Sequence, residues 1–461
     1  MRVVPNESTE SARSYTRAFM IEQVAVGPEV CVLILHRVRA QGVSPRFTQQ
    51  VLRILSGIPA VKCVAHDVSL PMPRWLSRLD FDAFVLDSSM LGYRWAPKSM
   101  FDRVRESVAF LSRRRGLKIA FPMDEFDRSA ALDRWLSDLG VDLVCTTLYA
   151  QRHLLLPECC SRAEVIPAWT SYIDDGLLQG SAGPLAGRPV DIGYRTRKLP
   201  FNFGRFGQLK SQVGERLRDR LAGSSLVHDV EVGEAFRIDG DAWIRFLRSC
   251  KFVLGAPSGS SIHDPSGAID TSVQSFLREQ PNADFDTVER ACFPGIDGRH
   301  EFSVLSPRVF EASMAGCCQV LVRGEYGGLL RPDEHYLPIE RDFSNLDEVL
   351  ERLKDIEAAS DVSMRCRDAL LSEPTLHANV RDRTLYAWIC ERRRPSESVN
   401  CVRDVRDAVR VNGGRQRWMR HTLAALDRAS SCFHRFQGRL PDPLGRALLR
   451  LHGCLQALRP R

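Results

Sequence analysis

The sequence predicts an α/β fold with two doubly wound domains that face each other across a cleft. Short apolar segments alternate with longer helical patterns, first between residues 30 and 170 and again between residues 190 and 354. Strands and helices that alternate along a chain build a parallel sheet with helices on both faces. Residues 176–188, rich in Gly, Ala and Ser, separate the two series and predict the connection between the domains.

The first series contains short apolar segments of strand length, each followed by a helical pattern. The expected strands are Val30–His36, Val61–Val64, Ala83–Asp87, Ile119–Pro122 and Leu143–Thr146. The expected helices are Pro45–Leu55, Ser99–Arg114 and Ala130–Leu139. This alternation predicts the first parallel sheet.

The second series repeats the alternation and predicts a second sheet. Its expected strands are Val190–Tyr194, Phe252–Gly255, Cys318–Val322 and Tyr336–Ile339, and its expected helices are Gln208–Ala222, Asp241–Cys250 and Asn345–Lys354. The predicted division is a disordered arm (1–24), a first domain (25–180), a second domain (181–390) and a helical basic extension (391–461). Because α/β folds bind ligands at the carboxyl ends of their strands, we expect the site at the mouth that both sheets share.

Composition narrows the class of protein. The chain has 461 residues, of which 44% are hydrophobic and 26% charged, as in folded soluble proteins, so most of it is not disordered. No apolar segment approaches the roughly 18 residues of a membrane span, and the start lacks the apolar core of a secretory signal. The 14 cysteines include no CxxC motif and several lie in apolar strand-like runs, so we expect reduced thiols in a cytoplasmic protein.

The net charge of +7 comes from the C-terminal segment. Residues 415–461 contain 10 Arg and 2 Asp, a charge of +8, which leaves about −1 for the rest of the chain. Apolar and basic residues are interspersed there, which predicts either peripheral contact with the inner face of a membrane or packing onto its own domain. Only 7 of the 64 basic residues are Lys, a bias that a GC-rich coding sequence produces, so we expect no nucleic-acid partner.

Residues 306–316 are the most informative stretch. Ser306 suits an N-cap, Pro307 suits the first helical position, and Gly316 can close the helix before the strand Cys318–Val322. The helix N-terminus and Arg308 attract phosphate. Glu311, one turn further, either accepts hydrogen bonds from ribose hydroxyls or is a surface acid.

This stretch carries a resemblance. Together with Gly324–Gly328, His335–Pro338 and Arg341–Asn345, it resembles the donor-binding domain of GT-B glycosyltransferases, especially bacterial group 1 and spore-maturation-protein-like members. The resemblance extends over about residues 186–360 and implies two Rossmann-like domains, a nucleotide-sugar donor and a ribose-binding role for Glu311. Ser303 stands where the superfamily has the first acid of its Glu pair, which leaves the sugar-hydroxyl contact unassigned.

The resemblance also implies cations for the leaving diphosphate. Arg205 and Lys210, five residues apart, resemble the Arg and Lys that neutralise it in group 1 enzymes, and Arg195 precedes them in the same domain. Fixed cations lower the barrier because the leaving group gains negative charge in the transition state. The alternative is that these are solvated charges at the start of a helix.

A Gly/Ser turn follows the strand Phe252–Gly255. Ser258, Gly259 and Ser260 allow close backbone approach to a ligand, and the two hydroxyls can bond to phosphate or sugar oxygens. The position at the carboxyl end of a strand favours donor binding over an ordinary surface loop.

Two acids follow the strand Ile119–Pro122. Asp124 or Glu125 is the candidate base that takes the acceptor proton in an inverting transfer, with Asp87 next in line. Each of these acids could instead cap a helix, and a retaining reaction needs no such base. The sequence has no HExxH or CxxC motif, so we expect no bound metal. We also expect no cofactor, because the nucleotide sugar is a substrate.

These observations together predict a metal-independent glycosyltransferase. It would move a sugar from a nucleotide-diphosphate donor to a hydroxyl of a glycan or lipid-linked acceptor, in cell-surface polysaccharide or glycoconjugate synthesis. The alternatives are a non-catalytic GT-B scaffold in polysaccharide assembly and a nucleotide-sugar epimerase or hydrolase.

Overall fold

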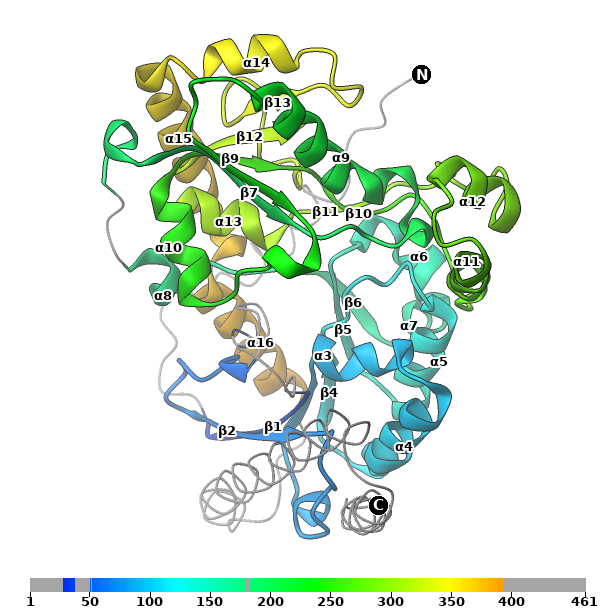
Figure 1. The fold of residues 1–461 in the computed structure, drawn as a ribbon. Coiled ribbons are helices and arrows are strands. Elements are labelled where there is room, and N and C mark those ends of the chain that lie inside the picture. Colours follow the sequence, from blue (N-terminus) through cyan, green and yellow to red (C-terminus); the bar gives the residue numbers. More distant parts are fainter. Residues whose placement is uncertain (1–27, 38–49, 51, 180–182, 394–461) are drawn as a thin grey trace, which may run out of the picture.

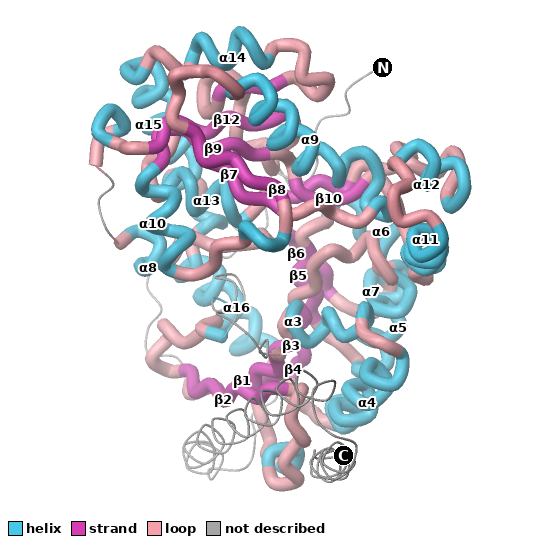
Figure 2. The backbone as a smooth tube through the Cα atoms, in the orientation of Figure 1, coloured by secondary structure: helices cyan, strands magenta, loops and turns pink. Residues whose placement is uncertain are grey.

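The chain forms two parallel β-sheets, each flanked by helices (Figure 1, Figure 2). The computed structural model describes residues 28–37, 50, 52–179 and 183–393. Each sheet together with its flanking helices forms one doubly wound unit, here called the first and the second unit. The two units confirm the predicted α/β class. The predicted N-terminal arm (1–24) and residues 394–461 of the predicted basic extension lie outside the described residues.

The first sheet has six strands in the order β2-β1-β3-β4-β5-β6. Their bounds are β1 Val30–His36, β2 Val61–Asp67, β3 Ala83–Leu86, β4 Leu117–Ala120, β5 Leu143–Thr146 and β6 Glu164–Pro167. Every residue of β1 is buried, which explains its unbroken apolar run. Because β1 lies between β2 and β3, the strand order reverses beside it, and a crevice opens there at the carboxyl ends.

The second sheet has five strands in the order β13-β12-β9-β7-β8, also all parallel. Their bounds are β7 Val190–Thr196, β8 His228–Val232, β9 Cys250–Gly255, β12 Cys318–Val322 and β13 Leu337–Ile339. The first strand of this unit, β7, lies between β8 and β9. The order therefore reverses beside β7, as it does beside β1 in the first sheet.

Helices connect the strands in both units. In the first unit they are α3 Ser88–Leu91, α4 Lys98–Val108, α5 Ser129–Leu139, α6 Arg152–Leu155 and α7 Pro157–Cys160. In the second they are α8 Asp175–Leu178, α9 Gly204–Leu221, α10 Asp241–Ser249, α13 Pro307–Met314, α14 Leu346–Arg352 and α15 Ile356–Leu371. None of the helices in the described part of the chain combines the length and the apolarity needed to cross a bilayer.

Helix α16 (Ala378–Arg392) returns to the first sheet (Figure 1). Trp388 and Ile389 are buried in one core with residues of β1, β3, β4 and β5. The indole Nε1 of Trp388 donates a hydrogen bond of 2.8 Å to Glu164 Oε2 at the start of β6. The first hydrophobic core is therefore completed by a helix that follows the whole second sheet.

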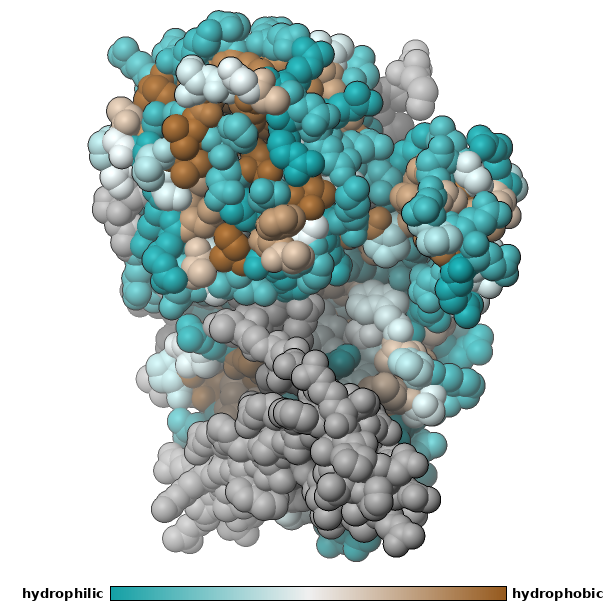
Figure 3. All heavy atoms as spheres, viewed as in Figure 1, coloured by the Kyte–Doolittle hydropathy of each residue, from teal (hydrophilic) through white to brown (hydrophobic). Residues whose placement is uncertain are grey.

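Residues 258–304 form an insertion between β9 and α13. It contains β10 (Ser258–Ser260), α11 (Ala268–Glu279), α12 (Phe285–Cys292) and β11 (Phe302–Val304), with β10 and β11 antiparallel. The helices α11 and α12 stand out as a mainly hydrophilic lobe (Figure 3). Phe302 is fully buried in the core of the first unit, where it stacks on Phe126 with ring centroids 5.7 Å apart.

The backbone also joins the insertion to the first unit. Arg128 N–H donates to the Asp264 carbonyl at 2.7 Å, and Asp264 N–H donates to the Phe126 carbonyl at 3.0 Å. The Arg128 side chain forms an ion pair with Asp270 at 3.0 Å. These contacts hold one side of the interface between the two sheets.

Candidate functional site

A cavity of about 730 Å³ lies between the two sheets, at the carboxyl ends of their strands. The first unit lines it with residues that follow β1, β3 and β4, and the second unit with residues that follow β7, β8 and β9. This is the shared mouth that the alternation of strands and helices predicts. Of the predicted site residues, the cavity lining includes Asp124, Arg195, Lys210, Ser258, Gly259, Ser306, Arg308 and Glu311.

Helix α13 presents its first turn to the cavity. Ser306 caps it by accepting a hydrogen bond from the backbone N–H of Arg308, with Pro307 in the first turn. Glu311 is only 7% exposed, and its Oε2 accepts a 2.8 Å hydrogen bond from the indole Nε1 of Trp243 on α10. The Arg308 guanidinium lies 5.3 Å from the centre of the same indole. The carboxylate is therefore held in one orientation at the cavity wall.

Lys210 lies in α9 and reaches the loop that follows β9. Its ammonium nitrogen donates a hydrogen bond of 2.7 Å to Ser258 Oγ. The pKa of Lys210 is lowered from 10.5 to about 8, mainly by burial and also by the nearby positive charges of Arg308 and Arg197, against the opposing effect of Asp124. Three cations that influence one another thus line the same cavity, an arrangement that stabilises a bound anion.

The turn at residues 258–260 approaches the insertion closely. Gly259 has a φ of 141°, and a Cβ there would come within 1.7 Å of the Phe302 carbonyl oxygen, so only Gly fits. Ser258 and Gly259 line the cavity. Ser260 is fully buried, and its hydroxyl bonds to the backbone of Ile262. The structure thus places Ser260 in the support of the loop and Ser258 at its surface.

Arg195, at the end of β7, lines the cavity but is held by neighbouring groups. Its guanidinium forms an ion pair with Asp229 at 2.6 Å and lies 4.6 Å from the Phe246 ring centre. Its carbonyl accepts a hydrogen bond from the Arg308 side chain. Arg195 therefore positions Arg308 through its backbone.

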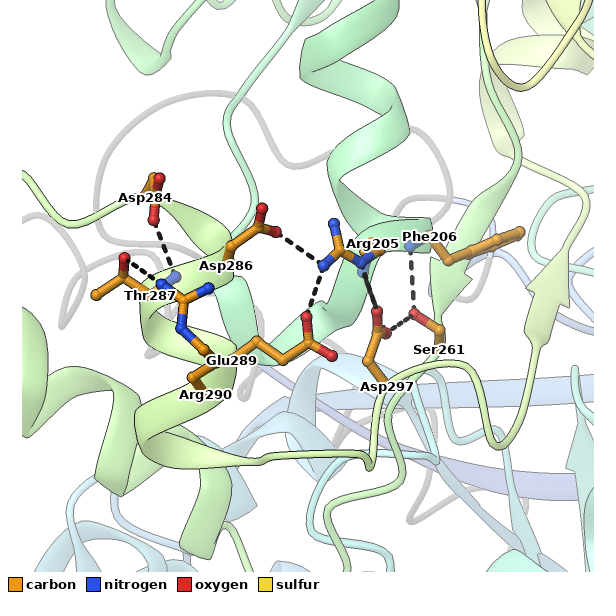
Figure 4. Close-up of polar contacts among 9 residues, drawn as sticks. All are labelled: Arg205, Phe206, Ser261, Asp284, Asp286, Thr287, Glu289, Arg290 and Asp297. Atoms are coloured by element: carbon orange, nitrogen blue, oxygen red, sulfur yellow. Dashed lines mark hydrogen bonds and ion pairs between the residues drawn. The ribbon is translucent and has the colours of Figure 1, made fainter.

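Arg205 lies apart from the other predicted residues. Figure 4 shows its guanidinium directed toward Asp286 and Glu289, and the distances are 2.8 and 2.7 Å. Its side chain is 58% exposed, and Arg205 is not among the cavity-lining residues. The structure brings Lys210 to the cavity and leaves Arg205, at the start of the same helix, with the acids of the insertion.

Asp124 and Glu125 point in different directions. Asp124 is exposed, lines the cavity and has a left-handed backbone with φ 52°. Arg94 holds this turn, since its guanidinium donates to the carbonyls of Met123 at 2.6 Å and Asp124 at 2.9 Å. The carboxylate of Asp124 therefore faces the cations of the second unit from a fixed turn.

Glu125 is buried and does not line the cavity. It accepts hydrogen bonds from Thr146 Oγ1 at 2.7 Å and from the backbone N–H of Thr147 at 3.2 Å. Burial raises the pKa of Glu125. Asp87 is buried as well, where it caps α3 through the backbone N–H of Ser89, and burial raises its pKa. Both acids therefore stabilise the backbone next to the cavity through hydrogen bonds.

Three further residues belong to the site although no sequence motif predicts them. Trp243 holds Glu311, Arg94 holds Asp124, and Trp95 lines the cavity beside Arg94. Each acts through a contact between distant segments, and no local motif marks such a contact. The adjacent pair Arg94-Trp95 after the strand β3 was the one available signal.

Ser303, where the resemblance places the first acid of the Glu pair, and Glu301, two residues earlier, lie outside the cavity. Ser303 bonds through its hydroxyl to the Glu325 carbonyl at 3.2 Å, and Glu301 pairs with Arg341 at 2.8 Å. Neither belongs to the cavity lining. Within the described residues, no group of three or more His, Cys, Asp and Glu side chains is arranged to hold a metal ion.

Comparison with known proteins gives structural matches alone. No protein-family profile and no curated protein sequence matches the chain. Among solved structures, an alpha-glucosyltransferase in complex with UDP and a 13-mer DNA containing a HMU base has a TM-score of 0.46 and 9% identity, and covers 78% of this chain and 99% of that chain. Anabaena HepE in complex with UDP-glucose has a TM-score of 0.44 and 9% identity, with coverage of 78% and 99%. An alpha1,3-fucosyltransferase has a TM-score of 0.40 and 9% identity, with coverage of 83% and 95%. The fold assignment rests on the two parallel sheets themselves.

Proposed function

We propose that the protein is a GT-B glycosyltransferase that moves a sugar from a nucleoside-diphosphate donor to a hydroxyl of a glycan or lipid-linked acceptor. One observation carries this proposal: Lys210, Arg308 and Arg197 converge in a cavity that Glu311 also lines. Cations beside a helix N-terminus suit a diphosphate, and a carboxylate held nearby suits the two hydroxyls of a ribose. Both halves of a nucleoside diphosphate therefore find matching groups on the second unit.

In the proposed reaction, the bond between the anomeric carbon and the diphosphate oxygen breaks, and the oxygen keeps the electron pair. Lys210 and Arg308 stabilise the charge that develops there, which is an effect exerted mainly in the transition state. In this proposal, side chains and helix-end N–H groups balance the charge of the leaving group.

The acceptor enters from the first unit. Its hydroxyl oxygen bonds to the anomeric carbon, and the Asp124 carboxylate takes the hydroxyl proton in an inverting transfer. Asp124 is suited to this step because it is exposed in the cavity, whereas Glu125 and Asp87 are buried and already hydrogen-bonded.

The proposal is tested by donor binding and donor turnover. The purified chain is titrated by calorimetry with UDP-, GDP- and dTDP-sugars, and release of the nucleoside diphosphate is followed by mass spectrometry. We expect one donor class to bind and to be slowly hydrolysed. Glu311→Ala should weaken binding, and Lys210→Ala should slow turnover. The matched control is Lys198→Ala, which removes an exposed lysine outside the cavity.

The outcomes separate the proposal from its rivals. Indifference to every nucleotide would overturn it and favour a non-catalytic scaffold. Rapid consumption of donor that no acceptor accelerates would instead indicate a nucleotide-sugar hydrolase or epimerase.

A further inference from the structure

The first unit contributes one large aromatic side chain to the cavity. Trp95 ends the short 3-10 helix Gly92–Trp95 that follows α3, and it lines the cavity together with Asp124. It is 39% exposed, so much of the indole is open to solvent. An exposed indole at the wall of a cavity marks a surface for ligand contact.

The indole of Trp95 is held in place from behind. The Arg94 guanidinium carbon lies 3.6 Å from the centre of the ring. A Cβ at Gly92 would come within 3.1 Å of the same ring, so the ring rests against the Gly92 backbone. A side chain fixed in this way loses little conformational entropy when a ligand packs on it.

Arg94 links the indole to the candidate base. It is only 2% exposed and donates hydrogen bonds to the carbonyls of Asp124 and Asp127, at 2.9 and 3.1 Å. One buried cation therefore fixes both the ring of Trp95 and the turn that carries Asp124. A ligand stacked on the ring would therefore share the cavity with the Asp124 carboxylate.

Resting on the proposed function, we infer that Trp95 is the platform on which a pyranose ring of the acceptor stacks. The C–H groups on one face of a pyranose are weakly positive and pack on the negative face of an indole, while its hydroxyls project sideways toward polar groups. Asp124 and Arg37, whose guanidinium lies over Tyr93 at 4.6 Å, are the charged residues that the first unit contributes to the cavity lining. The acceptor is accordingly a saccharide at its reactive end.

The test uses the full chain and methyl glycosides of glucose, galactose, mannose and N-acetylglucosamine as acceptors. Transfer from the donor that binds is measured for the parent, Trp95→Ala and Trp95→Phe. We expect Trp95→Ala to raise the acceptor KM about tenfold or more, and Trp95→Phe to restore most of the loss. Donor affinity and donor hydrolysis should stay unchanged. Saturation-transfer NMR on the glycosides, recorded with nucleoside diphosphate present, gives a second readout that does not need turnover.

The matched control is Phe236→Ala, which removes an aromatic side chain of similar exposure, 46%, outside the cavity lining. An unchanged acceptor KM in Trp95→Ala would overturn the platform and leave the proposed function intact. Donor hydrolysis without transfer to any glycoside would overturn the inference that the acceptor is a saccharide. It would leave the proposed donor site standing. Failure of every nucleotide to bind would overturn the proposed function and this inference with it.

Discussion

The ammonium group of Lys210 donates a hydrogen bond of 2.7 Å to the hydroxyl of Ser258. This bond joins a cation in the middle of α9 to the loop at the end of β9, where ligands bind in folds of this class. Because Ser258 is neutral, the bond orients the charge of Lys210 without cancelling it. The charge therefore stays available to a ligand anion.

The first prediction concerns the pH dependence that Lys210 imposes. Its pKa is lowered to about 8, so its positive charge is lost as the pH rises through that value. We expect kcat/KM, which reports groups of the free enzyme, to fall above about pH 8. Lys210→Arg should shift this alkaline limb to higher pH, because a guanidinium stays protonated. Lys210→Ala should lower kcat/KM on the order of a hundredfold below pH 8, and the difference from the parent should shrink above pH 8, where the parent has lost the same charge. The pH profile of kcat/KM for the three proteins measures this, and an alkaline limb that stays in Lys210→Ala would contradict the assignment.

The second prediction concerns the bond between Trp243 and Glu311. Trp243→Phe removes the N–H donor and keeps a ring against Phe246, which the indole stacks on at 5.5 Å. We expect the Kd of the donor to rise about fivefold to tenfold, with kcat little changed, since one hydrogen bond to a charged group is lost. Glu311→Gln should also reduce the preference for the ribonucleoside diphosphate over its 2′,3′-dideoxy analogue. Equal discrimination in parent and Glu311→Gln would show that the carboxylate does not meet the ribose.

The third prediction separates the two neighbouring acids. Asp124→Asn should slow transfer by about 10² to 10⁴ and leave the free energy of unfolding unchanged, because the side chain is exposed. Glu125→Ala should act mainly on the free energy of unfolding and not on the transfer step itself. It leaves the donors of Thr146 and Thr147 without their acceptor and should lower the free energy of unfolding by about 1–3 kcal/mol. Urea denaturation and single-turnover transfer decide between them. If Asp124→Asn transfers at the parent rate, product anomeric configuration read by NMR tests for a retaining mechanism.

The fourth prediction concerns Asp127 at the interface with the insertion. Burial raises the pKa of Asp127 from 3.8 to about 6, with the nearby charge of Asp264 adding to the effect against that of Arg94. Between about pH 4 and pH 6 the folded chain keeps this proton while the unfolded chain has lost it. The contribution of Asp127 to the free energy of unfolding is therefore fully present below about pH 4 and is lost as the pH rises through about 6.

The expected size of this loss is about 3 kcal/mol for a shift of about two pKa units. Asp127→Asn cannot titrate, so the difference in unfolding free energy between parent and variant should change by this order between pH 4 and pH 7. Urea titrations of both proteins across that range measure it. If the difference in unfolding free energy between parent and Asp127→Asn does not change with pH, the pKa of Asp127 is not raised in the folded chain.

Much of the fold is readable from the sequence because its strands are buried on both faces. β1 and β12 appear as unbroken apolar runs, and both strands lie in the centre of a core. By contrast, β8 and β6 are half-exposed and carry charged residues, so they have no such signature. The antiparallel pair β10 and β11 has only three residues in each strand, and its partners are distant in sequence.

The site is readable only in part, and Asp124 and Glu125 show why. Two adjacent acids after a strand look equivalent in sequence, yet the left-handed turn at Asp124 sends one into the cavity and the other into the core. The five-residue spacing between Arg205 and Lys210 predicts that both residues bind the donor diphosphate. Its actual partners, Asp286 and Glu289, lie about 80 positions later on α12, and no local pattern predicts such a contact.

The placement of Phe302 and α16 has a consequence for synthesis. As the chain leaves the ribosome, residues 30–167 emerge with all six strands of the first sheet, but the core around them still lacks Phe302 on one face and Trp388 and Ile389 on the other. Apolar surface on one face of that sheet stays open until Phe302 has been made, and on the other face until the last described helix has been made. The half of the protein that is translated first is thus the half that finishes folding last.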